Sequence, residues 1–288
     1  MRRSCRFTCG LAFFALAVGL CPARADDVES VKKKLYQAKK DYDGETRKFR
    51  KAVTDWLNKR EADARRSGNK KLLDQLKDEQ AAFENGEETP AKVPSMLQDQ
   101  LRFARGELDK TYAAAVKAYV LLKEDKLAAA TEKEQLKVVG ESALLYGRRT
   151  YPSQLKPFDV QVHTNWYDLE SKVAKIDGKL IPHSIMMHPE PKTFSNVSFN
   201  IGPKSSFFHA MVGVPSHRAL NGDPESPLTF EVLGDGKSLW KSEPVDKRDA
   251  LQTCLIRVEK VRVLSLRVHC SGGHIHAHGT WFGPVIAE

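Results

Sequence analysis

Cysteine is scarce in this 288-residue sequence, and three of its five cysteines lie in the first 25 residues. Only Cys254 and Cys270 lie beyond that segment, so a framework of several disulfide bonds is excluded. The alternating pattern places these two on neighbouring strands of a predicted hairpin, staggered by roughly 10 Å. A disulfide needs Cα atoms within about 7 Å of each other. We therefore predict two buried free thiols.

Motifs of several enzyme classes are also missing. The sequence contains no Gly-x-Ser-x-Gly elbow, no phosphate-binding glycine loop and no His-Glu-x-x-His motif. Glycoside hydrolysis needs two carboxylates about 5–10 Å apart, one of them with a raised pKa. The acidic residues of the C-terminal half are instead spread over predicted turns. We therefore expect a protein without catalytic activity.

Long apolar runs are absent after the first 25 residues. That opening segment has a basic start at Arg2, Arg3 and Arg6, an apolar run at 10–20 and the small-residue signal Ala23-Arg24-Ala25. These features are typical of a secretory signal peptide at 1–25, and the apolar run is too short to span a bilayer. We expect a secreted, periplasmic or cell-envelope protein with no membrane span.

The charge pattern argues against a nucleic-acid partner. Removal of the first 25 residues takes away four arginines and no acidic residue, which lowers the net charge from +9 to +5. The remaining Lys, Arg, Asp and Glu residues are interspersed along the chain. A protein that binds nucleic acid needs its basic residues gathered on one face.

Residues 26–140 have the pattern of amphipathic helices. Apolar residues recur at spacings of three, four or seven from Val31 to Trp56 and again from Leu97 to Leu122. An Asn-Gly pair and two prolines at 85–94 interrupt the pattern. Because each apolar stripe must be buried, we predict an antiparallel helical hairpin, with a dimerising coiled coil as the alternative. A linker is expected at 141–154.

Residues 155–288 have the alternating pattern of β-strands. The clearest unit is Pro227–Ser242, which contains a strand, a tight turn at Gly234-Asp235-Gly236 and a second strand with the expected buried pair Leu239-Trp240. Similar segments turn every 8–12 residues with no helical period between them. Two of these, at 254–258 and 264–270, are expected to form a hairpin. The pattern predicts an antiparallel β-sandwich or barrel.

Four motifs in this half occur in the order and spacing of one known family. They are YPSQLKP at 151–157, IPHSIMMHP at 181–189, VLGDGKSLW at 232–240 and AHGTW at 277–281. The sequence thus resembles the NPCBM domains, a family of carbohydrate-binding modules. The resemblance implies a galactose-binding-like jelly roll of two antiparallel sheets with a sugar as the ligand.

The sequence departs from the family pattern at two places. The segment GVPSH at 213–217 and the residue Gly283 stand where the family usually has acidic residues. Both departures remove carboxylates that could hold an ion or a hydroxyl group. They favour a module that has kept the fold without the sugar site.

Histidines are the first candidates for sugar binding. His183 and His188 occupy positions where the resemblance implies histidine, in a loop near one end of the sandwich, and either could donate to sugar hydroxyls or cap a strand. His276 and His278 alternate with His274, so on an extended segment all three would project to one side. These imidazoles could bind a sugar or a metal ion, or they could be structural.

Trp240 and Trp281 are the remaining candidates. Each could offer a flat face to a pyranose ring, or each could be an anchor of the sandwich core. No cofactor or metal is required by the pattern. The segment Asn221-Gly222-Asp223 with Glu225 could coordinate Ca²⁺ through oxygen atoms, and this stays a weaker alternative.

The leading hypothesis is a secreted, non-catalytic carbohydrate-binding protein. Its jelly roll would recognise a glycan or cell-surface polysaccharide, and its helical segment would act as a spacer or self-association element. The alternative is a structural or protein-interaction protein of the cell envelope that binds no sugar. A rim open to solvent at the histidines would favour the first hypothesis, and a helix lying across them would favour the second.

Overall fold

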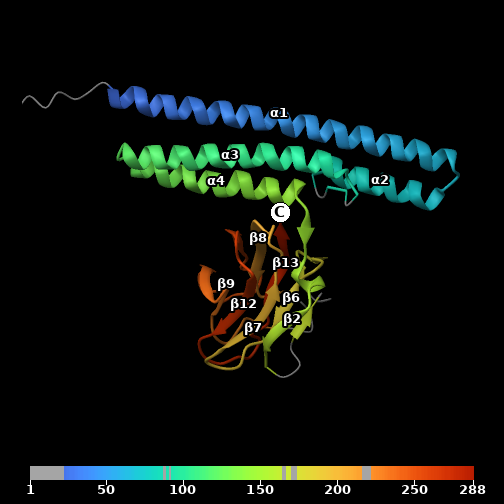
Figure 1. Cartoon of the computed structure of the whole chain (residues 1–288). Helices are drawn as coiled ribbons and strands as arrows, with labels where there is room; N and C mark the ends of the chain where they lie inside the picture. Colours follow the sequence, from blue (N-terminus) through green and yellow to red (C-terminus); the bar gives the residue numbers. More distant parts are fainter. Residues whose placement is uncertain (1–22, 87–88, 91, 164–166, 170–173, 216–221) are drawn as a thin grey trace, which may run out of the picture.

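A computed structural model describes residues 23–86, 89–90, 92–163, 167–169, 174–215 and 222–288 (Figure 1). The predicted signal peptide at 1–25 lies almost wholly outside this range. Helices occupy the N-terminal half and antiparallel sheets the C-terminal half, which confirms the predicted order of α followed by β. The elements of the helical half are α1 (Ala23–Arg66), α2 (Lys70–Glu84), α3 (Ser95–Leu121) and α4 (Asp125–Tyr146).

The two predicted apolar stripes pack against each other. On α1 the buried residues include Leu35, Tyr42 and Phe49, at heptad spacing, and on α3 they include Leu101 and Leu108. α1 runs the length of the helical part, with α2 and α3 along it, and α4 lies between α3 and the sheets (Figure 1). The predicted hairpin is therefore a helical layer that also contains α4. A coiled coil between two copies stays a prediction.

α4 continues past the boundary predicted at Gly140 and into the segment predicted as a linker. Gly140 does not end the helix but faces the sandwich, where a Cβ atom would lie 3.1 Å from Leu255 and 3.3 Å from Phe207. Glycine at this position lets the helix approach the sheet closely, because it has no Cβ atom to meet these side chains. The rest of that segment contains a short strand and a 3₁₀ turn, so the chain passes directly from α4 into the sandwich.

The sandwich consists of two antiparallel sheets in the described residues, with the strand orders β11-β8-β13-β6-β3, to which β1 is added beside β13, and β10-β9-β12-β7-β2. A small ribbon of β4 and β5 lies apart from them. The elements are β1 (Arg149–Thr150), η1 (Pro152–Gln154), β2 (Pro157–Gln161), β3 (Tyr167–Leu169), β4 (Lys175–Ile176), β5 (Lys179–Leu180), β6 (Ile185–Met187), β7 (Phe194–Asn200), β8 (Phe207–Gly213), β9 (Leu228–Gly234), β10 (Lys237–Lys241), β11 (Gln252–Arg257), β12 (Val263–Cys270) and β13 (Gly279–Ala287).

The predicted hairpin at Pro227–Ser242 is confirmed as β9 and β10. Its turn places Asp235 at φ 49° and Gly236 at φ 79°, the left-handed conformations of a two-residue hairpin turn. The prediction that Leu239 is buried is wrong, because Leu239 is 39% exposed. The register shifts between Ser238 and Trp240, so Leu239 is the additional residue of a bulge and points away from the core.

The predicted hairpin between 254–258 and 264–270 is also wrong. β11 pairs with β8 in one sheet, whereas β12 pairs with β7 and β9 in the other. An arch between sheets and a hairpin within a sheet bury the same alternating residues, so the pattern does not distinguish them. Cys254 and Cys270 are buried and free, as predicted, but they lie in opposite sheets.

Trp281 forms the centre of the sandwich core. It has no exposed surface, and its ring lies edge-on to that of Phe230 with a centroid distance of 5.5 Å. Phe208 and Trp240 approach it from other strands, at 6.3 and 6.4 Å. The two sheets therefore pack around β13. In the part of the chain that is described, no helix is both long enough and apolar enough to cross a membrane.

Candidate functional site

The two ends of the sandwich have different surroundings. β13 ends at Ala287 close to α4, and α4 also contacts β8 and β11. The helical layer covers this proximal end, and the opposite end, where β13 begins at Gly279, points away from the helices (Figure 1). We call the loops of that opposite end the distal rim.

Histidines gather at the distal rim. The ring centroids of His163, His188 and His274 are 4.8 to 5.4 Å apart in all three pairs. His278 adds a fourth ring, 5.0 Å from His188, and His276 lies 6.5 Å from His278. We call these five residues the histidine cluster. The structure thus brings together three of the predicted candidates, His188, His276 and His278.

Three loops carry the cluster, and main-chain contacts hold them together. His163 follows β2 and donates its backbone N–H to the carbonyl oxygen of His188, at 2.8 Å, in the loop after β6. Its ring Nδ1 lies 2.7 Å from the Glu190 carboxylate. Lys192 donates its backbone N–H to Gly272 in the loop before β13. The histidine cluster is therefore formed by loops that are far apart in the sequence.

The loop before β13 is folded rather than extended. His276 has φ 58°, and the backbone N–H of Ala277 donates to His274 while that of His278 donates to His276. The three histidines therefore do not project to one side, as they would from an extended segment. His274 and His278 still reach the same neighbour, His188, because the turn brings their rings around it.

Burial keeps two of these imidazoles neutral. His188 and His278 are each only 6% exposed. Desolvation, together with the neighbouring histidines, lowers the pKa of His188 to about 4. Desolvation, with a contribution from His276, lowers the pKa of His278 to about 4. A neutral imidazole carries one donor and one acceptor nitrogen, which suits hydroxyl groups.

The cluster is not arranged as a metal centre. Among the described residues, no group of three or more His, Cys, Asp or Glu side chains could hold a metal ion. For the alternative calcium site, Asn221 lies outside the described residues. The Asp223 carboxylate accepts a hydrogen bond from the backbone N–H of Arg248, and the Glu225 carboxylate accepts one from that of Ile275. These carboxylates tie the rim loops together.

His183 lies away from the cluster. Its ring stacks on Tyr151 at 3.9 Å, and its Nδ1 is 3.2 Å from Ser153 Oγ beside η1. It sits before β6, whereas His188 follows β6, so the strand separates them. The expectation that the two histidines lie in one loop is therefore wrong. His183 braces the entry of the chain into the sandwich.

The two tryptophans are core residues in this structure. Trp281 is completely buried and cannot present a face to a sugar ring, so this candidate is withdrawn. Trp240 is partly buried and packs against the core near Trp281. The surroundings of both residues favour a role in the sandwich core.

His163 and Glu190 were missed from the sequence. Neither belongs to the four motifs or to the histidine-rich segment. The signal that could have found His163 is its position just after the strand at 157–161, which pairs with β7. Because neighbouring antiparallel strands place alternate loops at the same end, His163 falls beside the loop that contains His188.

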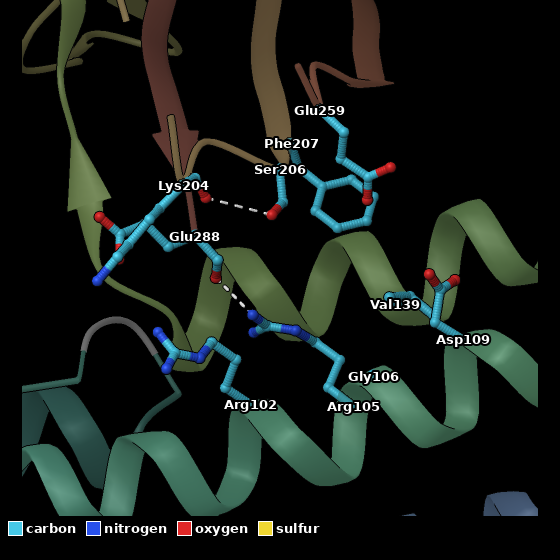
Figure 2. A pocket seen from close by; sticks show the side chains of 10 residues that line it. All are labelled: Arg102, Arg105, Gly106, Asp109, Val139, Lys204, Ser206, Phe207, Glu259 and Glu288. Carbon is cyan, nitrogen blue, oxygen red and sulfur yellow. Dashed lines mark hydrogen bonds between the residues drawn. The ribbon is translucent and has the colours of Figure 1, made fainter. Parts of the chain in front are cut away.

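A cavity of 360 Å³ lies at the proximal end, between α3, α4 and the sandwich (Figure 2). Arg105, which is 6% exposed, donates to the main-chain oxygen of Glu288. Arg257 at the end of β11 pairs with Asp109 on α3 and with Glu259. These contacts fasten the helices to the sandwich on the side away from the histidine cluster.

The family comparison matches the C-terminal half. Residues 155–287 match the model described as the NPCBM/NEW2 domain. A curated protein of Renibacterium salmoninarum, described as "Putative endo-alpha-N-acetylgalactosaminidase", is 28% identical over 100 residues, which are 35% of this chain. The chain spans only 6% of the length of that relative.

Two solved structures from Clostridium perfringens are each similar to part of this chain. One contains the CBM51-2 and INT domains of ZmpB in complex with GlcNAc, at 15% identity and TM-score 0.42, and the match covers 49% of this chain and 32% of that one. The other is a CBM51 from GH95 in complex with methyl-galactose, at 16% identity and TM-score 0.41, covering 49% of this chain and 100% of that one. The family match confirms the resemblance read from the four motifs, and residues 155–287 of this chain form an NPCBM/NEW2 domain.

Proposed function

We propose that the protein binds glycans at the distal rim of its sandwich, through the histidine cluster. The observation that carries this proposal is the meeting of His163, His188, His274, His276 and His278 at the end that points away from the helices. The family match and the sugar complexes of the two similar structures support a sugar as the ligand class.

The chemistry of the cluster suits a neutral sugar. At neutral pH the two buried imidazoles are uncharged, and partly exposed rings lie beside them. Hydroxyl groups can both donate to and accept from such nitrogens. Ile275, which is 59% exposed between His274 and His276, adds an apolar contact for the CH face of a ring.

The proposed role of the whole chain is non-catalytic. A signal peptide at 1–25 would direct it to the periplasm, the cell envelope or the medium, and the helical layer would hold the rim away from its point of attachment. The contacts between Arg257 and Asp109 and between Arg105 and Glu288 support a spacer that is fixed to the sandwich.

The alternative, a structural protein with no sugar ligand, would need the rim to be covered. The helical layer lies at the other end of the sandwich, which favours the glycan reading (Figure 1). The loss of acidic residues at Gly283 and at 213–217 remains the observation on the side of the alternative.

A glycan array probed with the full chain lacking residues 1–25 tests the proposal. We expect retention on one class of neutral glycans and its loss in the His274→Ala/His276→Ala double variant. The matched control is His183→Ala, which removes an imidazole outside the cluster and is expected to bind as the unchanged protein does. Absence of binding to any glycan, or equal loss in the control, would contradict the proposal.

A further inference from the structure

α1 and α3 carry a second row of residues at heptad spacing beside the stripe that packs them together. On α1 this row is Val31, Lys34, Ala38, Asp41 and Glu45. On α3 it is Gln100, Ala104, Glu107, Thr111, Ala114 and Ala118. Alternate steps of three and four are the spacing at which one helix meets another. The rows thus form a second helix-packing surface.

Both rows line one groove. A hollow of 460 Å³ lies between residues 38–45 of α1 and 100–111 of α3, and an adjoining hollow of 140 Å³ lies between residues 31–34 and 111–118. Thr111 borders both hollows. The α3 row runs from residue 100 to residue 118, which corresponds to about 27 Å of helix.

The walls of the groove suit a helix as occupant. Alanine at positions 38, 104, 114 and 118 leaves room for a second backbone to approach closely. Phe103 borders the larger hollow and is 71% exposed, so an incoming helix would cover its ring. Burial of such an aromatic ring favours association because it removes apolar surface from water.

The two halves of the groove have opposite charge. Asp41, Glu45 and Glu107 border the larger hollow, whose described lining has no basic residue. Lys34 borders the smaller one, where the described lining has no acid. Glu45 and Glu107 already pair with lysines one turn away, but such exposed pairs are weak and leave the carboxylates open to a second cation.

We propose that the groove is a dimer interface and that α1 of a second copy of this chain occupies it. A two-fold axis near Ala38 would set the two α1 helices antiparallel, with alanine against alanine at the axis. Lys34 and Asp41 lie four and three residues from Ala38, so each Lys34 faces the partner's Asp41. A two-fold interface requires this kind of self-complementarity, in which i meets j and j meets i.

This inference does not depend on glycan binding. The helical layer is at the proximal end and the histidine cluster is at the distal end, so dimerisation would leave both rims accessible (Figure 1). A dimer would present two rims to one polysaccharide, and linked sites raise the avidity without any new contact.

Sedimentation equilibrium of the full chain lacking residues 1–25 is the first test. We expect a dimer at micromolar concentration and a monomer for Ala38→Arg, with an unchanged circular dichroism spectrum. Lys33 is exposed and lies outside the lining of the groove, so Lys33→Glu is the matched control and should leave the dimer intact. A monomer at about 100 µM would overturn the proposal, and the groove would then be open to a different partner.

Charge exchange tests the pairing itself. Lys34→Glu and Asp41→Lys, each alone, are expected to raise the dissociation constant of the dimer about tenfold or more. The double variant Lys34→Glu/Asp41→Lys should restore it to within a few-fold, because the two charges only change places across the axis. Additive weakening in the double variant would overturn the proposed register.

Disulfide trapping locates the axis. Cys254 and Cys270 are buried, so a single new cysteine is the accessible thiol among the described residues. Ala38→Cys should form a covalent dimer on mild oxidation, because residues at a two-fold axis meet their own copies within the reach of a disulfide. Lys33→Cys should not. A dimer that traps at residue 33, or at neither position, would place the interface elsewhere and overturn the assignment.

Discussion

Asp109 on α3 and Arg257 at the end of β11 form a two-point ion pair across the joint between the helices and the sandwich. Burial works against the charge of Arg257, but the hydrogen bonds and negative charges of Asp109 and Glu259 together outweigh it, so the pKa of Arg257 is raised. Gln135 on α4 donates to the same carboxylate at 2.7 Å. Three elements thus meet at one side chain.

This joint predicts a loss of stability in Asp109→Asn. The substitution removes one charge and leaves Arg257 with a weaker acceptor, so the free energy of unfolding should fall by about 1–3 kcal/mol. Urea unfolding monitored by circular dichroism measures it. Lys51→Ala, which breaks the exposed pair between Lys51 and Asp55, is the control and should change stability by less than about 1 kcal/mol. Equal effects in the two variants would show that the joint pair is not structural.

Substitution of two helical glycines by alanine is expected to change the stability of the protein by different amounts. In Gly106→Ala the new Cβ meets no atom within 4 Å, so the variant should gain roughly 0.5–1 kcal/mol of helix stability. In Gly140→Ala the Cβ would lie 3.1 Å from Leu255, so the neighbouring side chains must shift and much of that gain should be lost. Thermal unfolding of both variants measures the difference. A Gly140→Ala variant as stable as Gly106→Ala would contradict the close contact of α4 with the sheet.

The buried histidines predict a loss of stability in mild acid. His188 and His278 have pKa values of about 4 in the folded protein, below the value of about 6.5 in an unfolded chain. Protons therefore bind the unfolded state first, and stability that is full above pH 6.5 falls as the pH drops toward 4. The loss should be on the order of 3 kcal/mol for one site, and less than twice that for both because the rings interact.

Urea unfolding at pH 7.5, 6, 5 and 4 checks this dependence. In His278→Gln the slope between pH 6.5 and 4 should become shallower, whatever the stability at pH 7.5. An unchanged slope would mean that His278 is open to water in solution.

The thiols predict chemical inertness. Burial raises the pKa of Cys254, and Cys270 is 2% exposed, so neither should react with a thiol reagent such as 5,5′-dithiobis(2-nitrobenzoate) in the folded protein lacking residues 1–25. In 6 M guanidinium chloride two thiols per chain should react. Fast reaction of one thiol under native conditions would contradict the packing of the corresponding strand.

The sequence predicted the elements in which apolar residues recur at one regular spacing along a single helix or strand. The heptad stripes of α1 and α3 and the alternating residues of β9 each follow from burial of one face. Leu239 and the strand at 254–258 did not follow, because a bulge and an arch between sheets leave the local pattern unchanged. Gly140 likewise reads as a helix end until the sheet beside it is known.

The candidate site was predicted only in part for a related reason. His188, His276 and His278 were selected from a family motif or from the run of alternating histidines, and the structure brings all three together at the distal rim. His163 belonged to no motif, and its position after the strand at 157–161 points to the rim only once the pairing of β2 with β7 is known. The Trp281 ring could stack on a sugar, but it is completely buried, and the alternation of apolar and polar residues alone does not reveal this.

The most direct test of glycan binding at the histidine cluster is a calorimetric titration of the glycan selected on the array into the chain lacking residues 1–25 at pH 7.5. We expect saturable binding with one site per chain, binding weakened at least about tenfold in His274→Ala/His276→Ala, and unchanged binding in His183→Ala. Saturable binding that survives the loss of both rim histidines would contradict the assignment of the histidine cluster as the sugar site.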